Sequence, residues 1–337
     1  MSEDWQPTAS RARLERRASA LAQVRAFFAS HGVMEVDTPV VVNAPVTDVH
    51  IHSAEVRFPD AADRAFFLHT SPEYAMKRLL AAGSGDIYQI CHVARGFERG
   101  RQHNAEFTIV EWYRVGFSLE RLMDEVEALA REVLGPVAHG VASERLTYRD
   151  AFMRALALDP LMCSLEDLNR AARDHGFEPA SRSAQAAPRV QLATPAASNR
   201  DELLDFLMAT RIGPQLGRRA LTFIHRYPAS QAALARLDPV DSRCALRFEL
   251  YCEGLELANG FHELASASEQ RARFEQDRAE RSRRGLAAHA PDERLLSALE
   301  SGLPDSSGVA LGFDRLLMLA TGATHIDEVL PFPTERA

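Results

Sequence analysis

The segment from Arg95 to Tyr113 joins a basic loop to a strand whose alternating residues could bind a cation. Arginine presents forked donors that match phosphate oxygens, so Arg95 and the loop that follows it could hold a phosphate chain. On the return strand, a period of two places Glu111 and Tyr113 on one face with two apolar residues. A carboxylate and a phenol beside apolar side chains suit a substrate ammonium group. The ordinary alternative is a solvated hairpin loop with surface charges.

A second segment, further along the chain, contains two carboxylates that could hold a divalent cation. Its Glu253-Gly254 dipeptide suits a two-residue hairpin turn. That turn places Glu249 opposite Ala258 and makes Glu256 its diagonal neighbour on the same face. Two carboxylates at this distance repel each other unless a cation lies between them, and Mg²⁺ accepts such oxygen ligands together with substrate phosphates. The ordinary alternative is a polar edge hairpin with its acids in water.

The return strand of this hairpin carries three further residues that could contact a polar ligand. Asn259, Phe261 and Glu263 alternate along it. In a regular register they point to the face opposite Glu256. They can share a pocket with Glu256 only if the strand bulges or twists near Asn259 and Gly260. We therefore expect an irregularity in this strand.

The third segment is a strand of small residues that leads directly into a helix. Glycine or alanine at Gly308, Ala310 and Gly312 allows a flat ligand to lie against the backbone. Arg315 falls in the first turn of the helix, where a cation opposes the helix dipole unless an anion is bound there. The ordinary alternative is an N-cap aspartate, Asp314, followed by an incidental arginine.

The elements that must position these segments alternate along the chain. Apolar residues at helical spacing predict helices near residues 11–30, 73–82, 119–134, 147–157, 164–175, 201–210, 266–284 and 314–321. Strands are predicted near residues 33–36, 87–95, 106–113, 221–225, 243–260 and 308–312. This order indicates an α+β fold with a mainly antiparallel sheet flanked by helices. One domain is expected over residues 11–337, with a low-complexity excursion at 178–199 that is dense in alanine, serine and proline.

Composition and charge exclude several classes of protein. The chain has 337 residues and a net charge of −8, so it lacks the basic signature of a binder of duplex DNA or anionic membranes. No apolar run approaches the ~20 residues of a membrane helix, and the acidic N-terminus is not a secretory signal. G-x-G-x-x-G and Walker A patterns are absent, which argues against Rossmann and P-loop sites. Four cysteines without a C-x-x-C pair indicate buried, reduced thiols in a cytoplasmic protein.

Together with residues 32–39, the three segments resemble motifs 1, 2 and 3 of the class II aminoacyl-tRNA synthetases of the lysyl type. The pieces typical of the lysyl type are residues 71–79, 103–108 and 258–264. The similarity extends from about residue 11 to the end of the sequence, and in combination these motifs are highly specific. The resemblance implies the antiparallel catalytic domain of that family.

Within that family the chain resembles the stand-alone paralogues that attach lysine to elongation factor P. About thirty residues precede motif 1, where lysyl-tRNA synthetases carry an anticodon-binding β-barrel. Residues 46–48, 223–231 and 307–312 also resemble these paralogues. The resemblance implies ATP-dependent activation of lysine or β-lysine as an adenylate. It further implies that the acceptor is a lysine of elongation factor P and not a tRNA.

The resemblance also implies a role for each site residue. The expected catalytic residues are Arg95 and Arg315. Arg95 is expected to hold the α-phosphate and the substrate carboxylate, and Arg315 is expected to hold the far phosphates. Glu249 and Glu256 are the expected ligands of Mg²⁺. The expected ATP-binding residues are Arg95, Gly96, Phe97, Asn104, Glu249, Leu250, Gly312 and Arg315. The expected substrate-binding residues are Ser71, Pro72, Glu73, Glu111, Tyr113, Glu256, Asn259, Phe261, Glu263 and Ala310.

Several positions depart from the family pattern, among them residues 93–94, where a small residue and phenylalanine are usual, and one position matches the paralogues. Phe97 stands where a glutamate is expected near the adenine amino group, and Ala105 stands where proline is usual. Glu98 could substitute for that glutamate, or Phe97 could stack on the base. Ala310 matches the paralogues, where tRNA-charging enzymes tend to have glycine. Its methyl group could favour β-lysine over α-lysine by ~1–3 kcal/mol if it is tightly packed.

Two other functions remain open at this point. A truncated class II enzyme could charge tRNA or another acceptor. A non-catalytic amino-acid-binding regulator would be indicated by degenerate arginines or acids, but Arg95, Glu249, Glu256 and Arg315 are all present. Motif 1 also implies a homodimer, because its helix and strand form the usual two-fold interface and exposed residues such as Phe27 need cover.

Overall fold

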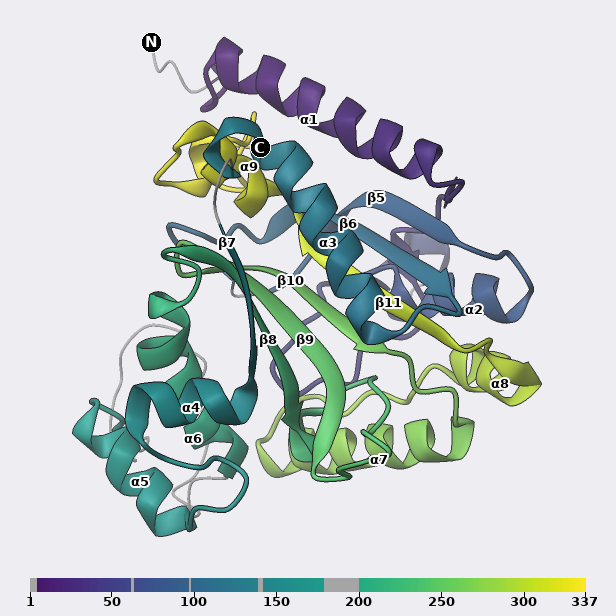
Figure 1. Cartoon of the computed structure of the whole chain (residues 1–337). Coiled ribbons are helices and arrows are strands. Elements are labelled where there is room, and N and C mark those ends of the chain that lie inside the picture. The colour runs from purple at the N-terminus through teal and green to yellow at the C-terminus, as the bar shows by residue number, and fades with distance from the viewer. Residues whose placement is uncertain (1–4, 62–63, 97, 139–141, 179–199) are drawn as a thin grey trace. The chain divides into compact units, whose positions relative to one another are not determined.

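The computed structural model describes residues 5–61, 64–96, 98–138, 142–178 and 200–337 (Figure 1). Contacts divide the chain into two compact units. Unit 1 contains residues 1–140, 265–277 and 289–337, and unit 2 contains residues 141–264 and 278–288. The single domain over residues 11–337 stays a prediction. All but the first residue of the expected excursion at 178–199 lie outside the described residues.

Unit 1 contains a sheet of four strands in the order β1-β5-β6-β11. These strands are β1 (Met34–Glu35), β5 (Ile87–Ala94), β6 (Glu106–Val115) and β11 (Ser306–Gly312). β1 runs parallel to β5, and the other two pairs are antiparallel. A small sheet, in the order β2-β4-β3, contains β2 (Val41–Val42), β3 (Glu55–Val56) and β4 (Phe66–Leu68). The helices are α1 (Arg11–Ser30), α2 (Glu73–Ala81), α3 (Leu119–Leu134), α8 (Glu293–Gly302), α9 (Phe313–Thr321) and the first part of α7 (Ala267–Arg283).

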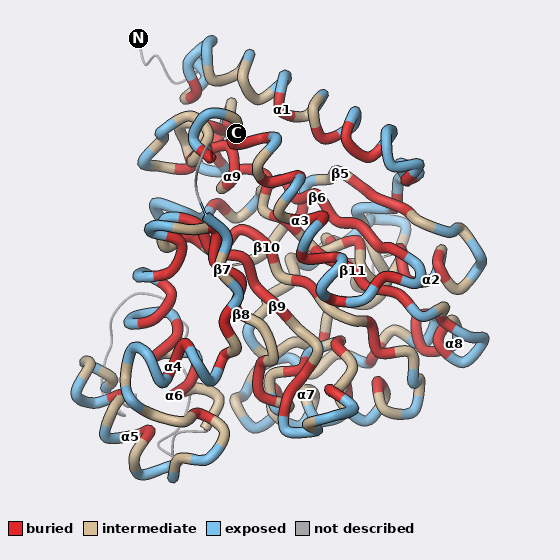
Figure 2. The backbone as a smooth tube through the Cα atoms, in the orientation of Figure 1, coloured by how far each residue is buried: buried red, intermediate tan, exposed pale blue. Residues whose placement is uncertain are grey.

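Alternate residues of β5 and β6 face two different helical layers. On one face, Trp112 contacts Phe28 of α1 and donates a hydrogen bond of 2.9 Å to Glu125 of α3. On the other face, Ile87 and Tyr113 pack with apolar side chains of α2 and α8. Both strands are therefore largely buried, as the red tube of Figure 2 shows. Glu111 and Tyr113, two of the predicted substrate-binding residues, lie on the α2 face.

Unit 2 contains four strands in the order β10-β9-β8-β7. They are β7 (Ala142–Thr147), β8 (Ala220–Pro228), β9 (Cys244–Cys252) and β10 (Leu255–His262). β7 runs parallel to β8, and the other pairs are antiparallel. The helices are α4 (Tyr148–Leu156), α5 (Leu165–Asp174) and α6 (Arg200–Leu207). The mainly antiparallel α+β fold expected from the sequence is thus confirmed.

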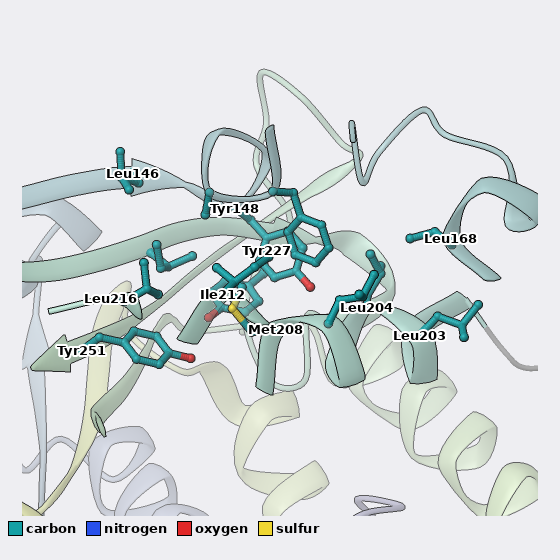
Figure 3. Packing of buried hydrophobic residues seen from close by; sticks show 14 of the residues in the cluster. Leu146, Tyr148, Leu168, Leu203, Leu204, Met208, Ile212, Leu216, Tyr227 and Tyr251 are labelled. Carbon is teal, nitrogen blue, oxygen red and sulfur yellow. The ribbon is translucent and has the colours of Figure 1, made fainter. Parts of the chain in front are cut away.

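The core of unit 2 forms where α4, α5 and α6 pack against β8 and β9. Figure 3 shows Tyr148 and Tyr227 in contact at its centre, with Leu203 and Leu204 of α6 beside them. The two tyrosine rings lie 4.8 Å apart between centroids. Tyr251 joins this cluster from β9. The close packing of this cluster holds β9, which also carries Glu249, in place.

Two further findings concern the exclusions made from composition. None of the described helices combines the length and the apolar character needed to cross a bilayer. All four cysteines are free thiols, of which Cys244 and Cys252 are buried and Cys91 and Cys163 are half-buried. The expectation of free thiols therefore holds for all four cysteines, and the expectation that they are buried holds for Cys244 and Cys252.

Candidate active site

Glu111 is the centre of a buried polar cluster in unit 1. Its side chain is 2% exposed, and its two oxygens accept hydrogen bonds of 2.7 Å from the Ser71 hydroxyl and the Tyr113 phenol. Glu111 and Tyr113 share one face of β6, as predicted, and Ala310 of β11 pairs directly with Glu111. Hydrogen bonds from two neutral donors favour the charged form of a carboxylate. The cluster therefore suits an ammonium group.

Glu73, a predicted substrate residue, is the first residue of α2. Its backbone N–H donates to the Ser71 hydroxyl over 3.0 Å, which links it to the Glu111 cluster. Its carboxylate accepts a hydrogen bond of 2.7 Å from the ammonium of Lys77, which is 1% exposed. Glu73 is thus one partner of a buried ion pair within a helix turn. Pro72 is the N-cap residue of the same helix.

Arg95 projects from the end of β5 and keeps about a quarter of its side chain exposed. Its Nε donates to the carbonyl of Thr70 over 3.2 Å, and its guanidinium lies 5.1 Å from the centre of the Phe107 ring. Its closest acidic partner in the loop is Glu98, at 3.8 Å. These contacts fix the root of the side chain and leave donors directed along the loop. Such donors suit a phosphate or a carboxylate.

Gly96 is needed for a close approach of two backbone segments. Its N–H donates to the carbonyl of His52 over 2.7 Å, and a Cβ on Gly96 would lie 3.2 Å from the Cβ of His52. A larger residue would push the loop away from this contact. Phe97, the predicted departure from the family pattern, lies outside the described residues.

Arg315 lies in the first turn of α9, beside the loop that joins β5 to β6. Its Nη2 is 2.6 Å from Nε2 of His103, and its Nε is 3.3 Å from the carbonyl of Gln102. Desolvation and the positive charge of Arg315 lower the pKa of His103. A neutral imidazole can accept from the guanidinium, so His103 orients Arg315 without repelling it. Asn104 bonds to the carbonyl of Glu106 and to the N–H of Thr334, and its contact with ATP stays a prediction.

Asp314 does not cap α9, which corrects the ordinary alternative for this segment. The N-cap residue is Gly312, and Asp314 lies inside the first turn with 2% of its side chain exposed. One of its oxygens accepts from the N–H of Thr108 over 2.7 Å, and the other pairs with Arg17 of α1. Arg17 also donates to the Thr108 hydroxyl over 2.6 Å. This triad ties the start of α9, and hence Arg315, to β6 and α1.

The hairpin of unit 2 has the predicted turn but a different register. Its turn residues, at positions 253 and 254, have φ of 51° and 75°, as a two-residue primed turn requires. The predicted pairing of Glu249 with Ala258 is wrong, because Glu249 pairs with Asn259. A β-bulge between Glu256 and Ala258 inserts the extra residue that shifts the register.

The bulge gathers the predicted residues of unit 2 on one face. Paired residues of antiparallel strands point to the same face, and Tyr251 pairs with Glu256 while Arg247 pairs with Phe261. Glu249 alternates with Arg247 and Tyr251 on β9, so it shares that face. The irregularity expected in this strand is confirmed, although it lies nearer to the turn. Glu256 therefore shares a face with Asn259 and Phe261, which a regular strand would have placed on the opposite face.

Glu249 is already compensated by protein groups. It is 7% exposed, and its oxygens accept from the Arg247 guanidinium and, over 2.6 Å, from the Tyr251 phenol. Arg247 also donates to Asn259 over 3.1 Å. Burial is the largest single influence and lowers the pKa of Arg247, but the Glu249 carboxylate together with other nearby acidic groups, Glu256 among them, outweighs it, so that the pKa is raised. A cation is therefore not required to neutralise Glu249, contrary to the argument from the sequence.

The donor set of this face fits Mg²⁺ that also binds phosphate. Glu249 and Glu256 lie on one face, and a carboxylate has about four acceptor positions, more than two partners use. Among the described residues, no group of three or more histidine, cysteine or acidic side chains could hold a metal ion alone. Mg²⁺ usually binds through one or two carboxylates with waters and substrate phosphates completing the shell.

Of the other predicted residues of unit 2, Glu263 and Leu250 are buried and Phe261 is half-buried. Glu263 is 1% exposed and forms an isolated bridge with Ala235, and Phe261 packs against the alanine cluster that contains Ala232 and Ala235. Leu250 is fully buried and alternates with Glu249, so its side chain points to the opposite face. An ATP contact by Leu250 stays a prediction and would involve its backbone.

Four residues that support the site were given no role from the sequence. Lys77 was detectable from its spacing of four from Glu73, and Arg247 from its alternation with Glu249. Arg17 had no local signal, because its partner Asp314 lies 297 positions away. Thr108 was likewise unpredictable, since its bond to Asp314 joins distant parts of the chain.

Three features of this chain are typical of the catalytic core of a class II aminoacyl-tRNA synthetase. They are an antiparallel sheet with a strand of small residues, an arginine at the start of the helix that follows this strand, and a basic loop between two strands. The chain belongs to the family of class II tRNA synthetases (D, K and N), which matches residues 4–336. It is 48% identical to the elongation factor P–(R)-β-lysine ligase of Vibrio parahaemolyticus over 99% of both chains. It is 47% identical to the ligase of that name from Vibrio cholerae, over 99% of both chains, and to that of Yersinia enterocolitica, over 99% of this chain and 98% of the other. The resemblance expected from the sequence is confirmed.

Proposed function

We propose that this chain activates lysine or β-lysine with ATP and transfers it to a lysine of elongation factor P. The observation that carries the proposal is the buried Glu111 carboxylate, held by Ser71 and Tyr113 beside the small residue Ala310. This arrangement offers a carboxylate to a substrate amine, with the small side chain of Ala310 beside it. The names of the relatives supply the acceptor and the isomer.

The reaction needs charge neutralisation more than proton transfer. The substrate carboxylate attacks the α-phosphorus of ATP, and pyrophosphate leaves with the electrons of the broken P–O bond. Arg95 would hold the α-phosphate and the attacking carboxylate, and Arg315 the far phosphates. Mg²⁺ on Glu249 and Glu256 would supply further positive charge to the leaving group. The acceptor amine then attacks the mixed anhydride, forms an amide and releases AMP.

The acceptor is tested by supplying ATP and labelled β-lysine with either purified elongation factor P or bulk tRNA. Label stable to alkali on the protein, as an amide should be, is the expected result. Alkali-labile label on tRNA at a comparable rate would instead favour a tRNA-charging enzyme. The net charge of −8 favours the protein acceptor, because a tRNA needs a basic track for its phosphates.

Replacing Ala310 with glycine should improve the use of α-lysine relative to β-lysine. Ala310 pairs with Glu111, so its methyl group lies beside the proposed amine site. Removing one methyl group from a tight pocket changes discrimination by about tenfold or more. The measurement is kcat/KM for each isomer in pyrophosphate exchange. If the ratio of the two values is unchanged, Ala310 does not select the isomer.

We also propose that the enzyme is a cytoplasmic homodimer. The argument from Phe27 is wrong, because that side chain is only 6% exposed and packs against Phe28 within the chain. Met34 of β1 is 50% exposed and is the better candidate for cover by a second copy. A monomeric mass by light scattering at micromolar concentration would contradict the dimer.

A further inference from the structure

Gln89 lies in a row with the residues of the proposed amine site. It pairs with Glu111 across β5 and β6, and Glu111 pairs with Ala310 across β6 and β11. Paired residues of antiparallel strands share a face, so all three side chains point to the α2 side of the sheet. None of the sequence motifs assigns a role to Gln89.

The amide of Gln89 is buried without ordinary partners. The residue is 1% exposed, and among the described residues neither Nε2 nor Oε1 has an oxygen or nitrogen atom as hydrogen-bond partner, so its weak hydrogen bond with the Cys91 thiol is the one compensation that it has. A buried polar group in this condition destabilises the folded state, and folded proteins rarely contain one without a reason. Glu111, directly opposite, has both oxygens bonded. Binding of a polar ligand on this face would supply the missing partners.

The surroundings of Gln89 identify the kind of ligand. The neighbouring thiol is that of Cys91, two residues along the same face, and burial followed by the Glu111 charge raises its pKa to about 12. Cys91 is therefore neutral and only a weak hydrogen-bonding group. Glu111 supplies the negative charge, and a second carboxylate at position 89 would repel it. A neutral amide oxygen instead adds an acceptor without adding charge, which suits a primary amine with several N–H donors.

We propose that Gln89 is a specificity-determining residue, whose amide oxygen accepts a hydrogen bond from the substrate amine that Glu111 binds. This inference rests on the proposed activation of a lysine-type substrate and deepens it. The amide would discriminate against amino acids whose amine cannot reach both acceptors. It would also explain why a polar residue occupies an otherwise apolar stretch between Ile87 and Cys91.

The test is Gln89→Met, which keeps the length of the side chain and removes both hydrogen-bonding groups. We expect the KM for lysine or β-lysine in pyrophosphate exchange to rise at least tenfold while the KM for ATP stays within twofold. The melting temperature of the ligand-free protein should be unchanged or higher, because two unpaired polar atoms leave the interior. A structural amide would give the opposite pattern, with lower stability and unchanged KM, and that result would overturn the proposal.

Two further variants complete the test. Gln270→Met is the matched control, since Gln270 is also 1% exposed and its Oε1 also lacks a partner among the described residues; its KM for lysine should stay within twofold. If Gln89→Met does not fold, Gln89→Asn keeps the amide on a shorter stem and should still raise that KM. Absence of exchange in the wild type with either isomer would refute the proposed function itself. Normal exchange in both wild type and Gln89 variants would refute only the role of Gln89.

Discussion

Arg315→Ala and Arg95→Ala should each lower the rate of adenylate formation by two to three orders of magnitude. Each change removes a charge-assisted contact to phosphate, and loss of one such preorganised donor costs ~2.7–4 kcal/mol. Arg315 is already oriented by His103 and Gln102, so its donors are fixed before ATP binds. The measurement is lysine-dependent pyrophosphate exchange.

The control for this experiment is Arg121→Ala. Arg121 is an exposed arginine of α3 that lies over the ring of Phe117, 3.7 Å from its centre, and has no proposed role in the site. That variant should keep its exchange rate within about twofold, since surface substitutions are usually small in effect. Near wild-type exchange in the Arg95 or Arg315 variant would remove the phosphate role of that residue.

Replacing Asp314 with alanine should have the largest effect on stability. The change leaves Arg17, 12% exposed, without its carboxylate and leaves the N–H of Thr108 unpaired. Removing one partner of a buried ion pair costs ~3–5 kcal/mol. We expect the midpoint of urea unfolding to fall accordingly at an unchanged m-value.

A second ion pair of α1 provides the matched control for Asp314. Arg11 and Glu15 are four residues apart, and their side chains are 92% and 64% exposed. Glu15→Ala should change the free energy of unfolding by no more than ~0.5 kcal/mol, as expected of an exposed pair. If Asp314→Ala unfolds at the same urea concentration as Glu15→Ala, the triad around Asp314 does not stabilise the fold.

Local patterns predicted those parts of the fold that depend on neighbours along the chain. The alternation of β6 gave the shared face of Glu111 and Tyr113 because that strand is regular. Ser118, a residue type typical of the N-cap, directly precedes the helix predicted over 119–134 and caps it, because its hydroxyl accepts from the N–H of Arg121 over 3.3 Å. The helix expected to reach residue 210 instead ends at Leu207 and continues as a wider turn to residue 212.

The parts that could not be predicted depend on contacts between distant segments. The bulge in β10 moved Glu249 from Ala258 to Asn259, and no glycine or proline between Glu256 and Ala258 announces it. The contact between Arg17 and Asp314 likewise joins the two ends of the sequence. The sequence could therefore propose the residues of the candidate site, whereas the ion pair that anchors the helix of Arg315 could not be predicted.

The burial of Lys77 has a consequence for any enzyme that handles an activated acyl group. Lys77 is the single lysine of the chain, and it is held against Glu73 with 1% of its side chain exposed. An acyl adenylate reacts with whatever primary amine it meets, and this protein presents no surface lysine to intercept it. Its guanidinium-rich exterior stays protonated and does not compete as a nucleophile. The proposed catalyst therefore offers no lysine side chain of its own to the activated acyl group, which leaves that group to the lysine of its acceptor.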